Sequence, residues 1–406
     1  MRLLLRLAAR NAVRQRRRSL VTFSAVFLSL AVLVTLRGFL NGLHAAIWQS
    51  VVFGQAGALE IHRKGYLSSG DASLELDVPT DEAFLAKIAA VPGVTAVAPR
   101  LSFGGMVTDG DETTFAFFDA LDPARELRVC PRRGEMVATG KTLGESGPAA
   151  AVLTPELAQA SHAHLGDRRT LLTSDRDGVL NGLDVELVGT YGQPGLPLPE
   201  KKIGFVELAL AQELLRMPGR ATELAVAVEH PERPEPMKPL LEAAVGGQYE
   251  VSTWHDVASF VDDVISNQNF ILGIVEGLFL LVAMLGVGNT MLLSVYERTR
   301  EIGTMMAIGV RRRDVLSLFL LEAALIALVA GIVGAAVAWA AVAYFGARGV
   351  VLHFPSVPRP VHIYPSLGLG YVLQMLSLCT GGAVLAALVP TLRGSRLRPV
   401  DALASV

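Results

Sequence analysis

Four long apolar segments divide the chain, and a long polar segment separates the first of them from the second. The apolar segments cover residues 19–43, 270–295, 315–345 and 367–392, and their only charged residues are Arg37, Glu276 and Glu322. A hydrocarbon core about 30 Å thick needs about 20 apolar residues in a helix. All four segments are long enough, so we predict four transmembrane helices rather than the buried core helices of a soluble protein.

The polar segment, residues 44–269, combines the periodicities of strands and helices. Two strand–helix–strand runs lie at its ends, the first over 58–62, 81–91 and 94–99 and the second over 223–228, 236–245 and 249–252. Thr80 is the expected N-terminal cap of the first helix. We predict that the two runs meet in one α+β subdomain, with about 132–217 inserted into it. The predicted fold class is an α-helical membrane protein with four transmembrane helices and a large α+β extracytoplasmic domain between helices 1 and 2.

Shorter elements are expected inside the insertion and beside the membrane. The insertion should hold strands at 170–173 and 184–190 and helices near 155–160 and 207–215. Residues 42–52 and 254–269 are expected to continue the first two membrane helices into the polar domain. Two helices that are continuous with the membrane could transmit movement mechanically.

The membrane orientation is predicted by the arginines beside the apolar segments. Seven arginines precede the first segment, five lie between the second and third, and three follow the fourth, whereas the loop 346–366 holds only Arg348 and Arg359. Short basic segments remain in the cytoplasm. We therefore place residues 1–18, the loop 296–314 and the tail 393–406 inside, and the polar domain and the loop 346–366 outside.

The first 18 residues have a pattern of their own. Arg2, Arg6, Arg10 and Arg14 recur every fourth residue, which aligns them on one face of a helix. We interpret this as an amphipathic helix at the inner membrane surface, although a plain basic flank explains the residues equally well. The apolar segment that follows is too long for a signal peptide and precedes no clear cleavage site, so we expect a retained anchor.

Cysteine and histidine spacing predicts neither a disulfide nor a metal site. Cys130 falls in the polar domain and Cys379 in the middle of a predicted span, so the two cannot meet. His162 and His164 stand two residues apart and would point to opposite sides of a helix, which is poor metal geometry. We therefore expect the polar domain to be held together by a packed core.

Two further patterns bear on binding and catalysis. Asp175, Asp177 and Asn181 resemble part of a calcium loop, but the closing glutamate is missing and a hairpin turn explains them better. The sequence contains no Gly-x-x-x-x-Gly-Lys-Ser/Thr run. We therefore expect no catalytic residue, no cofactor and no enzyme activity in this chain, and any ATP hydrolysis would come from another chain.

The segment after the second apolar stretch carries the most specific pattern of the sequence. Residues 294–303 are Ser-Val-Tyr-Glu-Arg-Thr-Arg-Glu-Ile-Gly, and Ala-Ile-Gly at 307–309 and a basic turn follow. With Glu322 early in the next span, this pattern resembles the permease family typified by MacB, which includes the lipoprotein-releasing permeases LolC and LolE and the cell-division permease FtsX. Residues 11–18, 91–99 and 393–404 match it too, so the resemblance covers essentially the whole chain.

The resemblance implies partners and a contact surface. Permeases of this family pair with a second permease subunit, here the same or a sister chain, and bind cytoplasmic ATPase subunits that hold ATP and Mg. The segment between spans two and three forms a coupling helix seated in a groove of the ATPase. Carried over residue by residue, the contact would consist of Glu297, Arg298, Arg300, Glu301, Ile302, Gly303, Ala307, Ile308 and Gly309. Charged residues would orient it, and the two glycines would let backbones approach or turn.

The resemblance also suggests a substrate. The sequence has no fused ATPase domain like that of the macrolide exporters, which favours a system that releases lipoproteins from the bacterial inner membrane toward the outer membrane, with the polar domain in the periplasm. Residues 165–174 and 189–191 match lipoprotein-releasing relatives, one of which recruits a periplasmic carrier through a hairpin. Here the hairpin 174–184 is short and carries Val179 and Leu180 at its tip. A carrier would therefore dock differently, or not at all.

Other functions remain open alternatives. The chain could export another amphipathic substrate such as a peptide, antibiotic or lipid, as MacB does. It could also transmit movement to a periplasmic cell-wall hydrolase as FtsX does, although the large insertion argues against this. A membrane-anchored enzyme would need an outward catalytic cluster, and a signalling receptor would need a cytoplasmic output domain. Membrane lipids are expected contacts, and nucleic acid is not.

Charged residues inside the predicted spans need partners, because an unpaired charge at that depth is costly. Arg37 and Glu276 each lie about five or six residues below the outer end of a span, or roughly 8–9 Å inside the boundary. We predict that they pair, within one subunit or across a dimer, where an acyl chain would enter. The alternative is that each reaches the surface separately. Glu322 is expected to meet basic residues of the loop 296–314.

Overall fold

The computed structural model describes residues 6–8, 10, 14, 16–69, 73–192, 202–352 and 360–395. The chain divides into two compact units. The helical unit comprises residues 1–44, 266–350 and 363–406, and the α+β unit comprises 45–265 and 351–362. Arg6, Arg10 and Arg14 are helical and exposed. The rest of the predicted amphipathic helix, including Arg2, lies outside the described residues, as do Arg359 and the tail from 396 onward.

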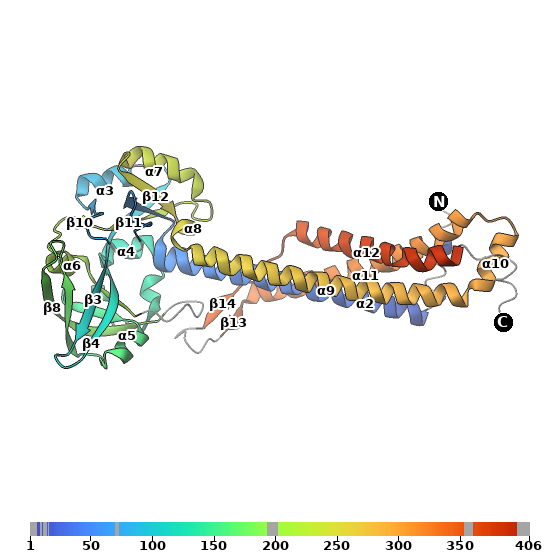
Figure 1. Cartoon of the computed structure of the whole chain (residues 1–406), viewed down its shortest axis with the longest axis horizontal. Coiled ribbons are helices and arrows are strands. Elements are labelled where there is room, and N and C mark those ends of the chain that lie inside the picture. Colours follow the sequence, from blue (N-terminus) through green and yellow to red (C-terminus); the bar gives the residue numbers. More distant parts are fainter. Residues whose placement is uncertain are drawn as a thin grey trace. The chain divides into compact units, whose positions relative to one another are not determined.

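Within the described residues, four helices are long and apolar enough to cross a membrane. They are α2 (Arg16–Val51), α9 (Ser259–Glu297), α11 (Arg312–Arg348) and α12 (Leu369–Ser395) (Figure 1). Successive helices run in opposite directions in the helical unit. Arg18 at the start of α2 forms an ion pair with Glu297 at the end of α9, and Asn41 donates a hydrogen bond to the carbonyl oxygen of Ser366 at 3.2 Å. The four spans predicted from the apolar pattern are present.

Small residues on α11 allow the helices of this unit to approach closely. Ala323, Ala327 and Ala330 are fully buried in its core. A Cβ atom added to Gly334 would lie 2.8 Å from the carbonyl oxygen of Phe27 in α2, so a larger residue would push the two helices apart. Membrane helices associate through such close packing, since lipid tails are as apolar as their side chains. α11 is accordingly the most buried of the four helices.

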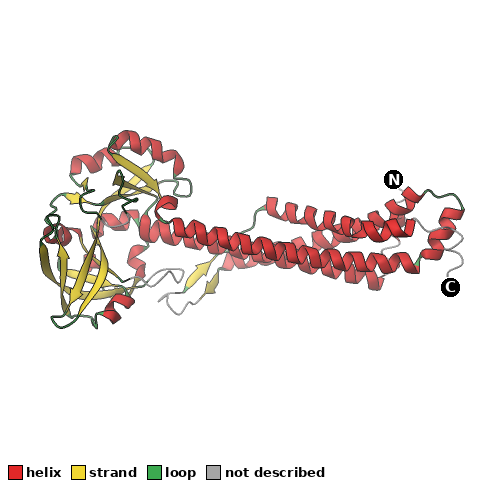
Figure 2. Cartoon of the chain, in the orientation of Figure 1, coloured by secondary structure: helices red, strands yellow, loops and turns green. Residues whose placement is uncertain are grey.

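The α+β unit is built on a sheet that has ten strands among the described residues (Figure 2). The strand order is β12-β1-β11-β3-β4-β9-β6-β8-β5, and β7 pairs with β3 and β8. The strands of this sheet are β1 (Leu59–Arg63), β3 (Val94–Thr108), β4 (Thr113–Leu121), β5 (Val137–Gly140), β6 (Ala150–Leu153), β7 (Arg168–Ser174), β8 (Leu180–Tyr191), β9 (Ile203–Glu207), β11 (Glu223–Val228) and β12 (Tyr249–Thr253). Two small ladders join β2 (Val78–Pro79) to β10 (Arg220–Ala221) and β13 (Val350–Leu352) to β14 (Val361–Ile363).

The two predicted strand–helix–strand runs meet in this sheet. β1 pairs antiparallel with β11 and β12, and β11 pairs antiparallel with β3. The insertion, however, does not form a sheet of its own. β3 is 15 residues long, and its second half pairs with β4 and β7, so it runs through both parts. The sequence predicted this strand only over the valine-rich residues 94–99 and missed its continuation to Thr108.

Short helices cover the sheet. They are α3 (Glu82–Ala89), α4 (Pro123–Val129), α5 (Pro155–Ala160), α6 (Leu208–Leu214), α7 (Lys238–Val245) and α8 (Trp254–Val257). α3 is capped by Asp81, whose carboxylate accepts a hydrogen bond from the Phe84 amide at 2.9 Å. The prediction that Thr80 caps this helix is wrong. The amide of Thr80 donates to the carbonyl of Gly219 at 3.0 Å, which holds Thr80 beside the β2–β10 ladder, one residue before the cap.

The two long helices meet the α+β unit differently. α2 continues to Val51, as predicted, and a π-helix, η1 (Val52–Ala56), extends it to Gly57, whose φ is +84°. Residues 254–269, in contrast, are not one helix, because α8 ends at Val257 and Ala258 separates it from α9. α8 starts with a capping box in which Thr253 and Asp256 satisfy each other's backbone amides.

Candidate functional site

α10 (Thr299–Ala307) stands between α9 and α11 and carries most of the predicted coupling residues (Figure 1). Gly309, with φ at +94°, turns the chain after this helix. That conformation is open to glycine and strained for other residues. The turn leads directly into α11, so α10 is a short helix held between two long ones.

Arg298 fastens α10 to α11. Its Nη1 lies 3.3 Å from Oε2 of Glu322, and its guanidinium stacks over the ring of Phe319 with 5.2 Å to the centroid. Its Nε also donates to Oε2 of Glu301 at 3.0 Å. The side chains of Arg298 and Glu322 are 10% and 3% exposed. Glu322 therefore meets a basic residue of the loop, as the sequence predicted.

Apolar residues hold the inner face of α10. Ile302 is fully buried and packs with Val295, Val315 and Phe319. Gly303 beside it is buried as well. This face of α10 is therefore part of the core and has no surface to offer another protein.

The outer face of α10 is polar, and one large apolar side chain, Ile308, follows directly at its C-terminal cap. The predicted coupling residues that are exposed are Glu297, Arg300, Glu301, Ala307, Ile308 and Gly309. Ile308 is 77% exposed, the highest value among the large hydrophobic residues of the described chain. The nine predicted residues thus divide into an exposed group of six and a buried group, Arg298, Ile302 and Gly303, that positions the helix. The sequence could not separate them, because the division depends on which face of α10 meets α11.

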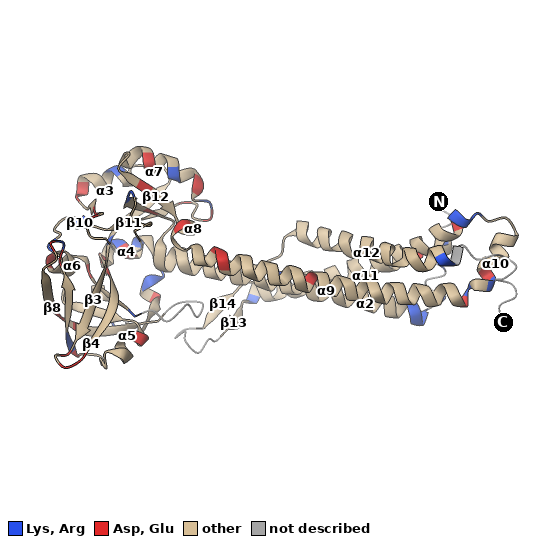
Figure 3. Ribbon diagram, viewed as in Figure 1, with Lys and Arg blue, Asp and Glu red and all other residues tan. Residues whose placement is uncertain are grey.

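The basic flanks of the helices gather at the same end of the helical unit (Figure 3). Arg18 pairs with Glu297, and the loop that holds α10 carries Arg300 and the exposed Arg311–Arg313. α10 also contacts α12, whose last turn carries Arg393. α10 is thus surrounded by positive charge.

The other two intramembrane charges, Arg37 and Glu276, lie at the opposite end of the helical unit, and their contacts differ from the prediction. Arg37 donates to the side-chain oxygen of Asn269 at 2.9 Å and lies over the ring of Tyr371, 5.4 Å from the centroid. The hydroxyl of Tyr371 donates to Oε1 of Glu276 at 2.6 Å. Tyr371 therefore stands between the two charges and contacts both.

The predicted direct pair of Arg37 with Glu276 within one subunit is wrong. Asn269 precedes Glu276 by seven positions in α9, which is about 10 Å along the helix. Arg37 reaches toward Asn269 and away from the depth of Glu276, so the two side chains use different partners. Pairing across a dimer stays a prediction.

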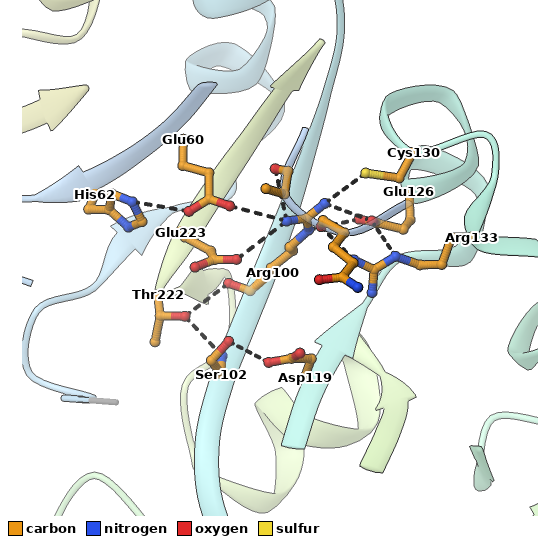
Figure 4. Close-up of polar contacts among 12 residues, drawn as sticks. Glu60, His62, Arg100, Ser102, Asp119, Glu126, Cys130, Arg133, Thr222 and Glu223 are labelled. Carbon is orange, nitrogen blue, oxygen red and sulfur yellow. Dashed lines mark hydrogen bonds and ion pairs between the residues drawn. The ribbon is translucent and has the colours of Figure 1, made fainter. Parts of the chain in front are cut away.

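A cluster of charged side chains is buried in the α+β unit, and sequence reasoning missed it (Figure 4). Arg100 of β3 forms a two-pronged contact with Glu126 of α4, with Nε 3.0 Å from Oε2 and Nη2 2.8 Å from Oε1. Arg133 adds a second cation 2.9 Å from the same carboxylate. Glu60 and Glu223 approach Arg100 at 3.5 and 3.7 Å. The only signal in the sequence was an arginine in a valine- and alanine-rich strand.

The cluster caps the end of the helix that begins as α2. The last carbonyls of a helix have no partner within it. In η1, Nη1 of Arg100 donates to the carbonyl of Ala56 at 3.1 Å, and Nη2 of Arg133 donates to that of Gln55 at 2.7 Å. The amide of Arg132 donates to the carbonyl of Phe53 at 3.0 Å. Positive side chains also suit the negative end of the helix dipole. Two buried arginines thus join this helix end to β3 and α4.

The ionisation of the cluster follows from its burial. Burial alone would raise the pKa of Glu126, but Arg100 and Arg133 outweigh it and lower that pKa. Burial and the charge of Glu60 raise the pKa of Glu223 to about 8. Burial would lower the pKa of His62, but its contact with Glu60 outweighs this and raises it. Glu223 therefore keeps its proton at neutral pH.

Glu60, His62 and Glu223 place three possible metal-ligand atoms within 4.8 Å of one another. The arrangement does not fit a cation, because Arg100 lies against both carboxylates and already supplies the positive charge. His162 and His164 are exposed and lie beside Glu112 and Asp167, respectively. Asp175 accepts hydrogen bonds from the amides of Asp177 and Val179, which is the hairpin turn that the sequence predicted.

The predicted partner hairpin is tied to its neighbours. Asn181 donates to the carbonyl of Leu214 at 2.7 Å, and the amide of Arg176 donates to that of Leu215 at 3.3 Å. Val179 and Leu180 remain 49% and 62% exposed. The tip is therefore apolar and accessible, while its base is fixed to α6.

An apolar cavity of about 510 Å³ lies between α4 and the strands β6 and β9. Leu121, Leu143, Val152 and Phe205 line it, with Tyr191 and the inner Arg133. Four carboxylates also border it, those of Asp122, Glu126, Glu145 and Glu207. The cavity is large enough for part of an amphipathic molecule.

A family model and several relatives match parts of this chain. Residues 273–397 match the model described as FtsX-like permease C-terminal. A macrolide export ATP-binding/permease protein MacB of Marinobacter nauticus is 29% identical over 235 residues, which cover 56% of this chain and 34% of the relative. The protein of the same name in Wolinella succinogenes is 34% identical over 153 residues, 37% of this chain and 22% of the relative. The chain spans about a third or less of the length of these relatives.

The periplasmic region of MacB from Actinobacillus actinomycetemcomitans aligns with 52% of this chain and 94% of its own length, at 12% identity and a TM-score of 0.35.

Proposed function

The chain belongs to the MacB- and FtsX-like family of ABC transporter permeases, and from that premise we propose that it converts ATP hydrolysis by a separate ATPase subunit into movement of its α+β unit. α10 would receive the force, and α2 and α9 would carry it. The chain would act in a dimer, with itself or with a sister chain. This chain would bind no ATP or Mg itself.

The observation that carries the proposal is the construction of α10. A helix that receives force from another protein needs an exposed face for contact and a rigid connection behind it. Ile308 and Arg300 supply the exposed face, and the buried Arg298–Glu322 pair and Ile302 supply the connection. A flexible basic loop would need none of these buried contacts.

The proposed orientation places α10 and the helix ends near it in the cytoplasm of a bacterial cell, at the inner membrane. The support is the arginine-rich end of the helical unit, because short basic segments remain inside. The α+β unit would then lie in the periplasm.

The proposed substrate is a lipoprotein or another amphipathic molecule, taken from the outer leaflet of that membrane. The apolar cavity beside α4 and the apolar hairpin tip support an amphipathic substrate. Export of another amphipathic molecule is an equally consistent second candidate, since the MacB relatives are named for the export of macrolides. Transmission of movement to a cell-wall hydrolase, as by FtsX, is a third.

Copurification tests the proposal. The full chain, purified in mild detergent, should retain an ABC ATPase subunit of its own cell, and Ile308→Asp or Glu301→Arg should abolish the association. Leu67→Asp, at a position 43% exposed in the α+β unit, is the matched control and should leave the association intact. An unchanged complex in both α10 variants would contradict the proposal.

A further inference from the structure

Three arginines converge on one buried carboxylate in the α+β unit, and one of them, Arg176, lies in the turn that also carries Val179 and Leu180. Asp77, directly before β2, has a side chain that is fully buried. Nη1 of Arg176 donates to its Oδ2 at 2.9 Å. Nη2 of Arg220 lies 3.2 Å and Nη1 of Arg63 lies 3.7 Å from its Oδ1. The three cations come from β10, the end of β1 and the turn between β7 and β8.

The charge of this group is not balanced. Three guanidiniums and one carboxylate give 3 − 1 = +2. Among the described residues, no second carboxylate lies within ion-pair distance of Arg63, Arg176 or Arg220. A further arginine, Arg216, lies one residue past Leu215, to whose carbonyl the Arg176 amide is bonded, and its own acid is Asp175. Adding that pair leaves the net charge at +2.

The guanidiniums are open to solvent although their carboxylate is not. The side chains of Arg63, Arg176 and Arg220 are 44%, 42% and 38% exposed, and each guanidinium has five N–H donors. One buried carboxylate accepts only a few of these donors. The remaining donors have no carboxylate partner among the described residues, while Asp77 holds the three cations close together despite their mutual repulsion.

From this geometry we infer that Arg63, Arg176 and Arg220 form a binding site for a phosphate group. A guanidinium fork matches two phosphate oxygens at once, and several forks around a single acid form a cradle that an anion would neutralise. Asp77 acts as the positioning residue of the site. The shared chemistry is that of inorganic phosphate and of an anionic lipid headgroup. The inference does not depend on coupling to an ATPase.

The surroundings make a lipid headgroup one of the two sources to test. Val179 and Leu180 lie in the same turn as Arg176 and expose apolar surface. A molecule with a phosphate and an apolar tail would find a partner for each part within this turn. Inorganic phosphate would use only the arginines.

Calorimetric titration of the purified full chain in a maltoside detergent tests the inference. Inorganic phosphate is one probe, and dihexanoyl phosphatidylglycerol below its critical micelle concentration is the other, both at constant ionic strength. Binding should weaken about tenfold in Arg176→Gln and in Arg220→Gln, which is about 1.4 kcal/mol. Arg168→Gln is the matched control, since Arg168 is exposed on β7 and takes part in no ion pair among the described residues.

The outcomes distinguish a lipid headgroup from inorganic phosphate, and both from arginines that serve only as counter-ions of Asp77. Tighter binding of the lipid than of phosphate assigns the site to a headgroup, and equal binding assigns it to phosphate itself. Arg63→Gln is a second, independent variant in case either of the others fails to fold, which its thermal unfolding would reveal. No measurable binding of either probe, or equal loss in Arg168→Gln, overturns the inference and leaves the three arginines as counter-ions of Asp77 only.

Discussion

The guanidinium of Arg298 lies 3.3 Å from the carboxylate of Glu322, 24 positions further along the chain, and both side chains are buried. This pair joins the loop that carries α10 to the first turns of α11. It turns a short helix between two membrane helices into a rigid part of the core. A force applied to the exposed side of α10 is then passed on to α11 and does not simply bend α10.

The first prediction concerns this pair. Arg298→Met should weaken ATPase binding about tenfold, because α10 loosens and Glu322 keeps a buried, unpaired charge. Adding Glu322→Gln should recover part of the loss, since the charge is then gone. A coupling energy of about 0.5–3 kcal/mol between the two substitutions is expected. Titration of the ATPase subunit onto the four purified variants measures it, and strictly additive losses would show that the pair does not act as a unit.

The second prediction concerns Arg100. Its replacement in Arg100→Met leaves Glu126 with one cation instead of two and leaves the Ala56 carbonyl without its donor. Breaking a buried pair by removing one partner costs about 3–5 kcal/mol. The thermal midpoint of the α+β unit in the full chain should fall accordingly.

A matched control for this substitution is Arg125→Met. Arg125 pairs with Glu82, whose side chain is 81% exposed, and with Asp122. Surface pairs contribute about 0–1 kcal/mol. Equal midpoints for the Arg100 and Arg125 variants would mean that the cluster does not hold the helix end.

The third prediction is a pH dependence. The pKa of Glu223 is about 8 in the folded chain and has an ordinary value of 4.5, so folding takes up a proton between these limits. The contribution of Glu223 to the free energy of unfolding is fully present below pH 4.5 and is lost as the pH rises through 8. His62, with its raised pKa, acts in the same direction above pH 6.5. The thermal midpoint should therefore fall from pH 5 to pH 8, by the equivalent of a few kcal/mol in order of magnitude.

Glu223→Gln isolates this effect, because the amide keeps the shape and carries no proton to lose. The variant should show a much flatter midpoint between pH 5 and pH 8. Glu126 has a lowered pKa, so its stabilisation is lost as pH falls below 4.5 and lies outside this window. An unchanged slope in the variant would place the titrating group elsewhere.

The fourth prediction concerns the charges within the membrane. Tyr371→Phe removes the hydroxyl that donates to Glu276 and keeps the ring beneath Arg37. If Glu276 acts through that hydroxyl, Tyr371→Phe and Glu276→Gln should lower ATPase-coupled transport to a similar extent, and the double variant should be no worse. The exchange Arg37→Glu with Glu276→Arg should not restore transport, because Arg37 contacts Asn269. Full rescue by the exchange would instead support a pair across a dimer.

The sequence was sufficient for the parts of the fold that depend on long patterns. Span positions followed from apolar length. Alternation marked the strands at 58–62 and 223–228 and valine content marked the one at 94–99, but the order β1-β11-β3 in which they pair was not predicted. Exact ends were harder to predict. Thr80 and Asp81 are both good caps by residue type, and only the hydrogen bond from Thr80 to Gly219 decides between them.

The sequence predicted only those parts of the candidate site whose residues lie close together in the chain. The glutamates between arginines at 297–301 marked α10, but the burial of Arg298 rather than of its neighbours depends on packing against Phe319. Arg100 and Asp77 were not predicted, because their partners come from segments distant in the chain. No periodicity in one segment reveals a contact of that kind.

The account's central claim is that force enters at α10 and leaves through the α+β unit. The most direct measurement is the distance between spin labels at Asp177→Cys and Leu369→Cys in the full chain, diluted with unlabelled chain and bound to its ATPase. Cys130 and Cys379 are buried and should stay unlabelled. The account predicts that trapping ATP with vanadate shifts this distance and that Ile308→Asp abolishes the shift. A distance that ignores ATP, or a shift that persists in Ile308→Asp, would contradict it.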